Sequence, residues 1–329
     1  MATTEQTYLR TALEQRRTRL HHLLHSQAAD IALSKLLQDV DAALVRLDLG
    51  TFGICETCHD SIEKDRLLAD PLARFCLDHL TTAEQRALER DLTLAANIQR
   101  ALLPKRDFAP VGWDVHYHYQ PAGMVSGDYC DIFETSGGLL FMLGDVSGKG
   151  VAASMLMSHL HATFRSLAEA GLPLERMVED ASRIFCESTL AGQYATLVVG
   201  RATRDGAVEF VSAGHLPVLH LHPQGATPKE STGVPLGMFS DARFPVHRLT
   251  LADGDTLFLY TDGLTECRNS AGAEYGLHRI RALAAQHAAA LPANLIAKCL
   301  DDLRVFGEGS KPTDDLTLLA VRRASRPVA

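Results

Sequence analysis

The stretch GLLFMLGDV, residues 138–146, is a continuous apolar run that ends at an aspartate. Such a run predicts a buried strand. The glycines that surround the aspartate, in GDVSGKG (144–150), allow a backbone or a ligand to approach closely. We therefore expect a strand whose end presents a carboxylate.

Other segments around this strand predict its neighbours. WDVHYHYQ (113–120) alternates apolar and polar residues, as a half-buried strand does. Further strands are predicted in YATLVVGRAT, AVEFVSAG, PVLHLH, DTLFLYTDG and DDLTLLAVRR, and helices over 151–171, 174–189, about 275–288 and 292–306. Paired helices and grouped strands argue against regular βαβ winding. They favour an α+β fold, with antiparallel sheets and helices packed outside them.

Aspartates recur in four short stretches: VSGDYCD (125–131), GDVSGKG (144–150), YTDGLTE (260–266) and KPTDDLT (311–317). In three of these stretches an acidic residue lies beside a predicted buried strand, with a glycine nearby. A single aspartate of this kind is usually a turn former. Several that converge at strand ends suit Mg²⁺ or Mn²⁺, which prefer oxygen ligands. Two such ions about 3.5–4 Å apart can hold a phosphoryl group and activate a water. The set predicts a catalytic metal centre.

These four stretches resemble, in order, the metal motifs of the PPM-type metal-dependent Ser/Thr phosphatases, and in particular their RsbU/SpoIIE branch. Supporting blocks are IQRALLP (98–104), GKGVAASMLM (148–157), SAGHLPVL (212–219) and PLGM (235–238), so the resemblance covers about residues 93–323. It implies a two-sheet β-sandwich flanked by helices and two or more Mn²⁺ or Mg²⁺ ions. Carried over by position, it implies that Asp128, Asp145, Asp262, Asp314 and the carbonyl of Val146 bind the metals, with Asp131 and Asp315 supporting them.

No Cys-x5-Arg loop of the cysteine phosphatases occurs, and GDVSGKG lacks the spacing of a P-loop. His215 is either a proton donor near the metals or a packed turn histidine. Lys149 either helps to bind phosphate or is a solvated turn lysine.

The other chemical pattern lies upstream, as Cys55-x2-Cys58-x17-Cys76-x2-His79. Two short chelating pairs at this separation predict one structural Zn²⁺ with a Cys₃His ligand set. A redox pair would leave Cys76 and His79 unexplained, and His59 is the alternative fourth ligand.

Residues 33–82 resemble the DksA/TraR zinc finger, with His79 in place of its usual fourth cysteine. That family binds RNA polymerase through a helical hairpin with acidic residues at its tip. Apolar spacing from Leu9 to Leu47 predicts such a hairpin here, and its tip offers only Asp30.

Composition argues against several classes of partner and location. The chain has 32 Lys and Arg against 40 Asp and Glu, a formal net charge of −8, which argues against bulk binding of nucleic acid. No signal peptide and no apolar run of about 18 residues is visible. With 7 cysteines, an odd number, we expect reduced thiols, a cytoplasmic location and no membrane partner.

The expected organisation is a helical hairpin with a zinc finger (1–82), a helical linker (83–108), the phosphatase domain (109–323) and a tail (324–329). The linker carries an apolar seam that suits either a homodimer or packing on its own domain; its residues are Leu88, Leu92, Ala95, Ile98 and Leu102.

Two functions are therefore predicted from the sequence. The first is a protein serine/threonine phosphatase regulated through the zinc module; the resemblance implies a phosphorylated anti-sigma-factor antagonist of STAS type as substrate. The alternative is a zinc-finger transcription modulator that binds RNA polymerase or another protein and uses the phosphatase-like domain as a scaffold.

Overall fold

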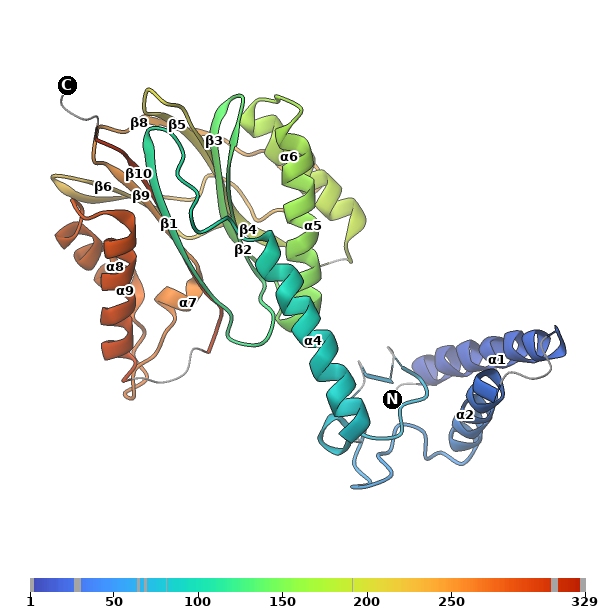
Figure 1. The fold of residues 1–329 in the computed structure, drawn as a ribbon. Coiled ribbons are helices and arrows are strands. Elements are labelled where there is room, and N and C mark those ends of the chain that lie inside the picture. The colour runs from blue at the N-terminus through green and yellow to red at the C-terminus, as the bar shows by residue number, and fades with distance from the viewer. Residues whose placement is uncertain are drawn as a thin grey trace. The chain divides into compact units, whose positions relative to one another are not determined.

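The structure, a computed structural model, describes residues 3–26, 31–63, 66–67, 70–80, 82–190, 192–308 and 313–325. It consists of two compact units, Met1–Arg90 and Asp91–Ala329. The division between them falls inside helix α4, Thr82–Leu102 (Figure 1).

The smaller unit begins with the predicted pair of helices. Helix α1, Thr3–Ser26, packs against helix α2, Ile31–Asp48. Leu9, Leu13 and Val40 are buried between them because apolar residues recur at helical spacing. Residues 27–30 lie outside the described residues, and with them the predicted tip residue Asp30.

The cysteine-rich segment shares the core of this helical pair. Cys55 and Cys76 are buried together with Phe52, Ile62 and Leu67. A short 3-10 helix, η1, Leu77–His79, ends the segment. The hairpin and the cysteine cluster therefore stabilise each other through one apolar core.

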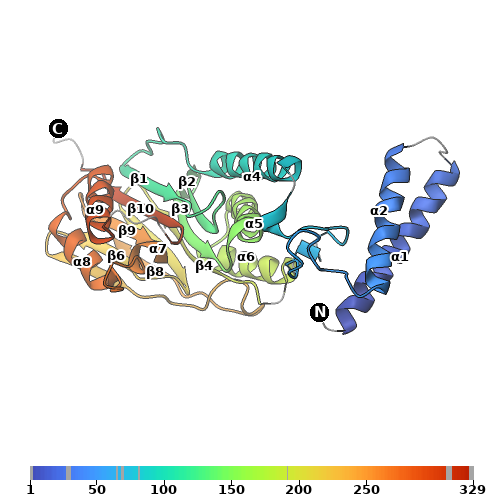
Figure 2. The ribbon, with the colours of Figure 1, turned by 90° about the horizontal axis from the view of Figure 1, so that it is seen from below.

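The larger unit contains two five-stranded antiparallel sheets in the described part of the chain (Figures 1 and 2). The first, in spatial order, consists of β1 (Trp113–Gln120), β10 (Leu316–Arg323), β9 (Thr256–Tyr260), β6 (Val218–His222) and β7 (Gly225–Lys229). The second consists of β2 (Asp128–Thr135), β3 (Gly138–Val146), β4 (Ala195–Ala202), β5 (Ala207–Ala213) and β8 (His247–Thr250).

Helices cover the outer faces of both sheets. Helices α5 (Gly150–Ala168) and α6 (Leu174–Ser188) pack on the β2–β8 sheet, and α8 (Gly276–Gln286) and α9 (Pro292–Phe306) pack on the other (Figure 1). A short helix, α7 (Asp262–Thr265), follows β9. This arrangement confirms the predicted two-sheet sandwich flanked by helices.

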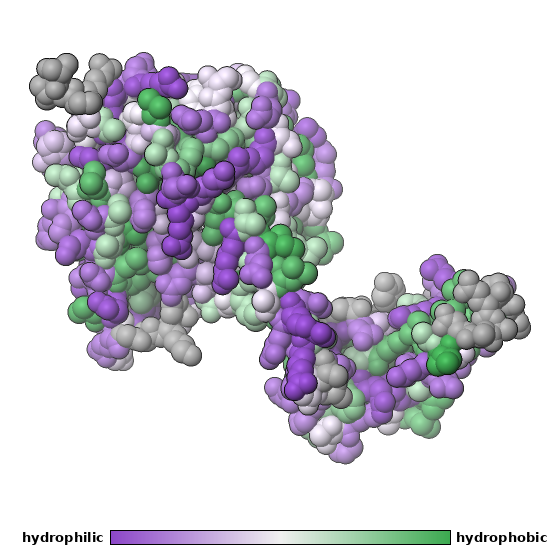
Figure 3. Space-filling view, in the orientation of Figure 1, coloured by the Kyte–Doolittle hydropathy of each residue, from purple (hydrophilic) through white to green (hydrophobic). Residues whose placement is uncertain are grey.

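Alternation along the strands separates the apolar layers. In β2, Cys130 and Ile132 face the inner layer between the sheets, whereas Tyr129 faces the layer beneath α5 and α6. On the face shown in Figure 3, hydrophilic residues predominate and apolar ones lie in small groups among them. Within the described ranges, no helix combines the length and the apolar character that crossing a membrane requires.

Candidate active site and zinc site

Two of the predicted metal ligands come from one hairpin. Strands β2 and β3 pair so that Asp128 lies directly opposite Asp145. Gly144, next to Asp145, allows β4 to approach, because a Cβ there would stand 2.4 Å from the carbonyl oxygen of Thr196. Hairpin pairing therefore brings together two aspartates that are 17 positions apart in the sequence.

Asp128 is held from the opposite sheet. Its side chain is 1 % exposed, and its Oδ2 accepts hydrogen bonds from the Thr261 hydroxyl at 3.0 Å and from the Thr317 hydroxyl. Its Oδ1 is also buried but has no hydrogen-bond partner. A buried carboxylate oxygen without a partner is costly, so this atom is suited to bind a cation.

Asp262 and Asp314 flank strands of the first sheet and lie near Asp145. Strands β9 and β10 are antiparallel neighbours, so the residues after β9 lie beside those before β10. Asp262 starts α7 immediately after β9, and Asp314 precedes β10. Gly263 permits this contact, since a Cβ on it would stand 2.0 Å from the carbonyl oxygen of Asp315.

The carboxylates of these aspartates repel one another, and their exposure decreases from Asp314 at the rim to the buried Asp128. Burial, followed by Asp262, Asp314 and Asp315, raises the pKa of Asp145 to about 7. Burial and then Asp145 raise the pKa of Asp128 well above its ordinary range. Burial and then Asp314 raise the pKa of Asp262. A cluster of this kind needs a positive counter-charge to remain ionised at neutral pH.

The backbone at Gly127 leaves room beside these carboxylates. A Cβ on Gly127 would lie 3.1 Å from the carbonyl oxygen of Val146 and 3.2 Å from Asp145 Oδ1. Both oxygens therefore face the same small space. An all-oxygen donor set, one member of which is an orphaned buried atom, fits Mg²⁺ or Mn²⁺.

The two predicted supporting aspartates have different surroundings. Asp315 accepts hydrogen bonds from the backbone N–H groups of Ala122 and Gly127, both at 2.8 Å, and so fixes the loop that precedes Asp128. Asp131 lies on the opposite face of β2, where Arg165 donates two hydrogen bonds of 2.7 Å to it. The structure brings Asp315 to the cluster and places Asp131 in an ion pair beneath α5.

Lys149 and His215 are also placed by the fold. Lys149 Nζ lies 2.9 Å from Asp314 Oδ2 on an exposed side chain. His215 is buried; its Nδ1 lies 3.0 Å from the Thr196 hydroxyl and its Nε2 lies 3.1 Å from the carbonyl oxygen of Tyr260. Both imidazole nitrogens are thus engaged, and His215 joins β4 to β9 as a packed histidine.

Three residues of the site escaped the sequence analysis. Thr261 and Thr317 bind Asp128, and Thr317 N–H also donates to the Thr261 hydroxyl at 3.0 Å. Gln99, on α4, is 3 % exposed and bonds to the backbone of Ser126. The one signal in the sequence was the position of Gln99 on the apolar face of the helix, seven residues after Leu92 and four after Ala95, where a polar side chain is unusual.

The cysteine cluster forms a compact second site. The ligand atoms of Cys55, Cys58, Cys76 and His79 all lie within 4.8 Å of one another. Cys76 Sγ lies 3.1 Å from His79 Nδ1 and 3.8 Å from Cys58 Sγ. His59 is not a member of the cluster. Three sulfurs and one imidazole nitrogen fit tetrahedral Zn²⁺ with no open position.

Local structure aims these groups at one point. Cys55 N–H donates to the Asp60 carbonyl at 2.8 Å, and His59, with a positive φ of 60°, turns the chain between them. His79 N–H donates to the Cys76 carbonyl at 3.0 Å, which closes the second pair. Burial acts to raise the pKa of Cys55, but backbone N–H donors outweigh it and lower this pKa to about 6. Such a thiol readily becomes the thiolate that zinc binds.

Two family models match the chain. Residues 135–324 match stage II sporulation protein E (SpoIIE), and residues 50–78 match the prokaryotic dksA/traR C4-type zinc finger. The second match includes the three cysteines and ends one residue before His79.

Comparison of this chain with individual proteins also finds phosphatases of this kind. Phosphoserine phosphatase RsbU of Bacillus subtilis is 26 % identical over 244 residues, which cover 73 % of this chain and 72 % of RsbU. The structure of the RsbU and RsbW domains of a Mycobacterium tuberculosis protein is 32 % identical, with a TM-score of 0.57 over 65 % of this chain and 61 % of that one. The SiaA-PP2C domain of Pseudomonas aeruginosa has the same fold, with a TM-score of 0.66, 21 % identity, and coverage of 74 % and 99 %.

Proposed function

Because this chain belongs to the SpoIIE family of PP2C-type serine phosphatases, we propose that residues 109–323 hydrolyse phosphoserine or phosphothreonine in a protein substrate with the help of two or more Mg²⁺ or Mn²⁺ ions. The observation that carries this proposal is the unpartnered, buried Oδ1 of Asp128 opposite Asp145. The similarity to RsbU supports the reaction class.

Four aspartates and one backbone carbonyl are the proposed metal ligands. Asp128, Asp145, Asp262 and Asp314, with the carbonyl of Val146, would hold the ions. When bound there, Mg²⁺ or Mn²⁺ supplies Lewis acidity, which neutralises phosphoryl oxygens and lowers the pKa of water.

Other groups keep the ligands in position. Thr261 and Thr317 fix the orientation of Asp128 by their hydrogen bonds. Lys149, paired with Asp314 at the exposed rim, offers a positive charge to an incoming phosphate. No side chain has to form a covalent bond with the phosphoryl group.

Turnover of p-nitrophenyl phosphate tests the reaction. We expect hydrolysis only when Mn²⁺ or Mg²⁺ is added, and we expect Asp145→Asn to lose nearly all of it. Asp301→Asn is the matched control, because Asp301 is an exposed aspartate of α9 whose ion pair with Arg304 is at the surface. Wild-type rates in Asp145→Asn would disprove the metal assignment.

The physiological substrate in this proposal is a phosphorylated anti-sigma-factor antagonist of STAS type. Two similarities support it: RsbU is a phosphoserine phosphatase, and the M. tuberculosis protein joins an RsbU domain to an RsbW domain. A phosphorylated STAS protein that co-purifies with the chain and loses its phosphate when Mn²⁺ is added would meet the expectation. A STAS phosphoprotein that stays phosphorylated while p-nitrophenyl phosphate is hydrolysed would contradict it.

In this proposal, residues 1–82, which would carry the zinc ion, regulate the phosphatase domain through the linker 83–108. The same linker would provide the contact between two copies of the chain in a homodimer. The closed Cys₃His arrangement supports a structural rather than a catalytic zinc. A chain truncated to residues 93–329 should differ from the full chain in turnover, oligomeric state or response to the substrate protein. Identity in all three would contradict regulation by the module.

A further inference from the structure

A cavity lies in the larger unit, away from the aspartate cluster. It has a volume of about 730 Å³ and is lined by residues 100, 101, 103–106 and 108, which end α4 and follow it, and by residues 115–121, in and just after β1. Strand β1 is the edge of its sheet, so its outer backbone groups are not used by another strand. The volume is in the range of about 300–1,000 Å³ that small-molecule sites occupy.

The lining of this cavity is positively charged. Arg100, Lys105 and Arg106 contribute to it together with His116 and His118, and no aspartate or glutamate does. Among the described residues, no carboxylate forms an ion pair with these two arginines or this lysine. In a chain with a net charge of −8, three cations without counter-ions around one cavity call for an anionic ligand.

The charge crowding also affects the histidines. The pKa of His116 is lowered by burial and then by Arg106. The pKa of His118 is lowered by burial, although Gln120 opposes this shift, and also by His116 and Arg106. The imidazoles are therefore neutral at neutral pH and can donate a hydrogen bond to an anion without adding to the repulsion.

The rest of the wall is apolar and aromatic. Phe108, Val115, Tyr117 and Ile132 line it. The Tyr117 hydroxyl donates a hydrogen bond of 2.7 Å to the Pro104 carbonyl, which fixes this ring against the segment after α4. The cavity thus combines a surface for a flat, weakly polar group with a cationic rim.

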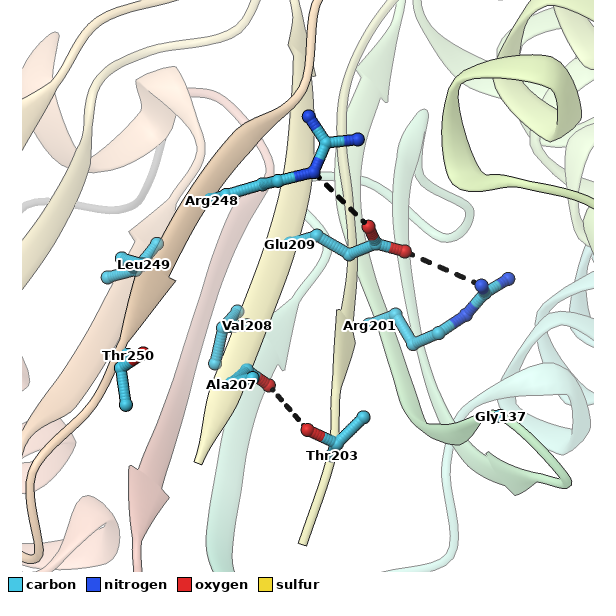
Figure 4. Close-up of a pocket in the computed structure, with 9 residues that line it drawn as sticks. All are labelled: Gly137, Arg201, Thr203, Ala207, Val208, Glu209, Arg248, Leu249 and Thr250. Carbon is cyan, nitrogen blue, oxygen red and sulfur yellow. Dashed lines mark hydrogen bonds and ion pairs between the residues drawn. The ribbon is translucent and has the colours of Figure 1, made fainter. Parts of the chain in front are cut away.

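The cavity shown in Figure 4 lacks this combination. It measures about 540 Å³ and lies at the end of the β4–β5–β8 face. Its charged groups are already paired, because Glu209 lies between Arg201, at 3.4 Å, and Arg248, at 3.9 Å (Figure 4). Of these two cavities, the β1 cavity is therefore the one whose charged side chains have no ion-pair partner among the described residues.

We propose that the cavity between the end of α4 and β1 binds a nucleotide, with its base against Phe108 and Tyr117 and its phosphates at Arg100, Lys105 and Arg106. This site goes beyond the proposed phosphatase activity, and its test requires no turnover. The ligand would connect the last turn of α4 to the strand that leads, through Gln120, into the loop held by Asp315.

Isothermal titration calorimetry on the full, zinc-loaded chain without added Mg²⁺ or Mn²⁺ tests the proposal, with ADP, ATP and pyrophosphate as probes. We expect saturable binding of the two nucleotides and weaker binding of pyrophosphate, which lacks the base. Arg106→Gln and Lys105→Gln should each weaken binding about tenfold or more, since each removes one charge-assisted contact. Both side chains are exposed, so the fold should tolerate the changes.

Two controls complete the design. Arg304→Gln removes an exposed arginine on α9 and should leave the affinity unchanged. Asp145→Asn should also bind the nucleotides like the wild type, which separates this site from the aspartate cluster. Dissociation constants above about 1 mM for all probes, wild-type affinity in Arg106→Gln, or a large change of affinity in Asp145→Asn would each overturn the proposal.

Discussion

The side-chain amide of Gln99 forms two hydrogen bonds with the backbone of Ser126. Gln99 Nε2 donates to the Ser126 carbonyl at 2.6 Å, and Ser126 N–H donates to Gln99 Oε1 at 3.0 Å. The Ser126 hydroxyl in turn accepts from Asp128 N–H at 3.0 Å. Helix α4 is thereby connected to the first predicted metal ligand through two residues.

Loss of this connection should impair the active site. Gln99→Ala leaves the buried amide and carbonyl of Ser126 without partners, at a cost of about 1–3 kcal/mol. We expect kcat/KM for p-nitrophenyl phosphate to fall about tenfold and the Mn²⁺ concentration for half-maximal rate to rise. Asn97→Ala, at an exposed position of the same helix, is the control. Unchanged metal dependence in Gln99→Ala would refute the link.

Removal of either threonine hydroxyl should misplace Asp128. Thr317→Val keeps the shape of the side chain but removes a hydrogen bond to a buried carboxylate, which contributes about 1.5–3 kcal/mol. We therefore expect weaker metal binding, measured as a rise of about tenfold in the Mn²⁺ concentration at half-maximal rate. Thr261→Val should weaken metal binding at least as much, because it also leaves the buried Thr317 N–H without its acceptor.

Thr256→Val is a matched control for these variants. Thr256 is equally buried, but its hydroxyl has no hydrogen-bond partner. Its replacement should leave the metal requirement unchanged and should not lower the stability. Equal effects in Thr256→Val and Thr317→Val would mean that packing, not the bond to Asp128, is responsible.

The sequence was sufficient to predict the main elements and most of the larger fold. Helices α8 and α9 and strand β4 lie within two or three residues of their predicted ranges, because long apolar patterns dominate there. Strand β2 (Asp128–Thr135), which carries Asp128, was not predicted. Strands β7 and β8 were also missed. Each has five residues or fewer, β7 contains Gly225 and Pro228, and neither has a buried stripe.

The candidate site was predictable only in part, because a local sequence pattern does not show which residues distant strands bring into contact. Aspartates beside glycines at strand ends are visible in the sequence. The structure places Asp145 close enough to Asp128, Asp262 and Asp314 for the charges to raise carboxylate pKa values. The groups that orient them depend on pairings between distant strands. Thr317 contacts Asp128 across 189 positions, and no local pattern marks such a threonine. Asp131 satisfied the local pattern, but the alternation of β2 turns it toward Arg165.

The zinc site should depend on His79 and not on His59. His79→Ala removes one of four clustered ligand atoms, and we expect the purified chain to lose its zinc and the smaller unit to unfold at lower temperature. His79→Cys should keep one zinc per chain, because Cys₄ is an equally suitable ligand set. His59→Ala is the control and should retain zinc. Zinc content measured by inductively coupled plasma mass spectrometry decides the matter, and loss of zinc in His59→Ala alone would reverse the assignment.

His215 should make the larger unit less stable in acid. Burial lowers the pKa of His215 to about 4, against 6.5 for the free side chain, and the hydrogen bond to Tyr260 opposes this shift only partly. Between these two values the unfolded chain binds the proton and the folded chain does not, so the free energy of unfolding rises with pH. The stability that this residue contributes is therefore complete above pH 6.5 and is lost as the pH falls toward 4. One pKa unit corresponds to about 1.4 kcal/mol, so the whole effect is about 3 kcal/mol.

Urea unfolding followed by the fluorescence of Trp113 measures this effect in the larger unit alone, because Trp113 is the single tryptophan and is buried there. We expect the unfolding free energy of the wild type to fall more steeply between pH 7 and pH 4.5 than that of His215→Gln, whose amide can still donate to the Tyr260 carbonyl but does not titrate. The carboxylates titrate alike in both proteins, so the difference between the two slopes isolates His215. Parallel pH profiles would show that His215 does not carry the acid sensitivity.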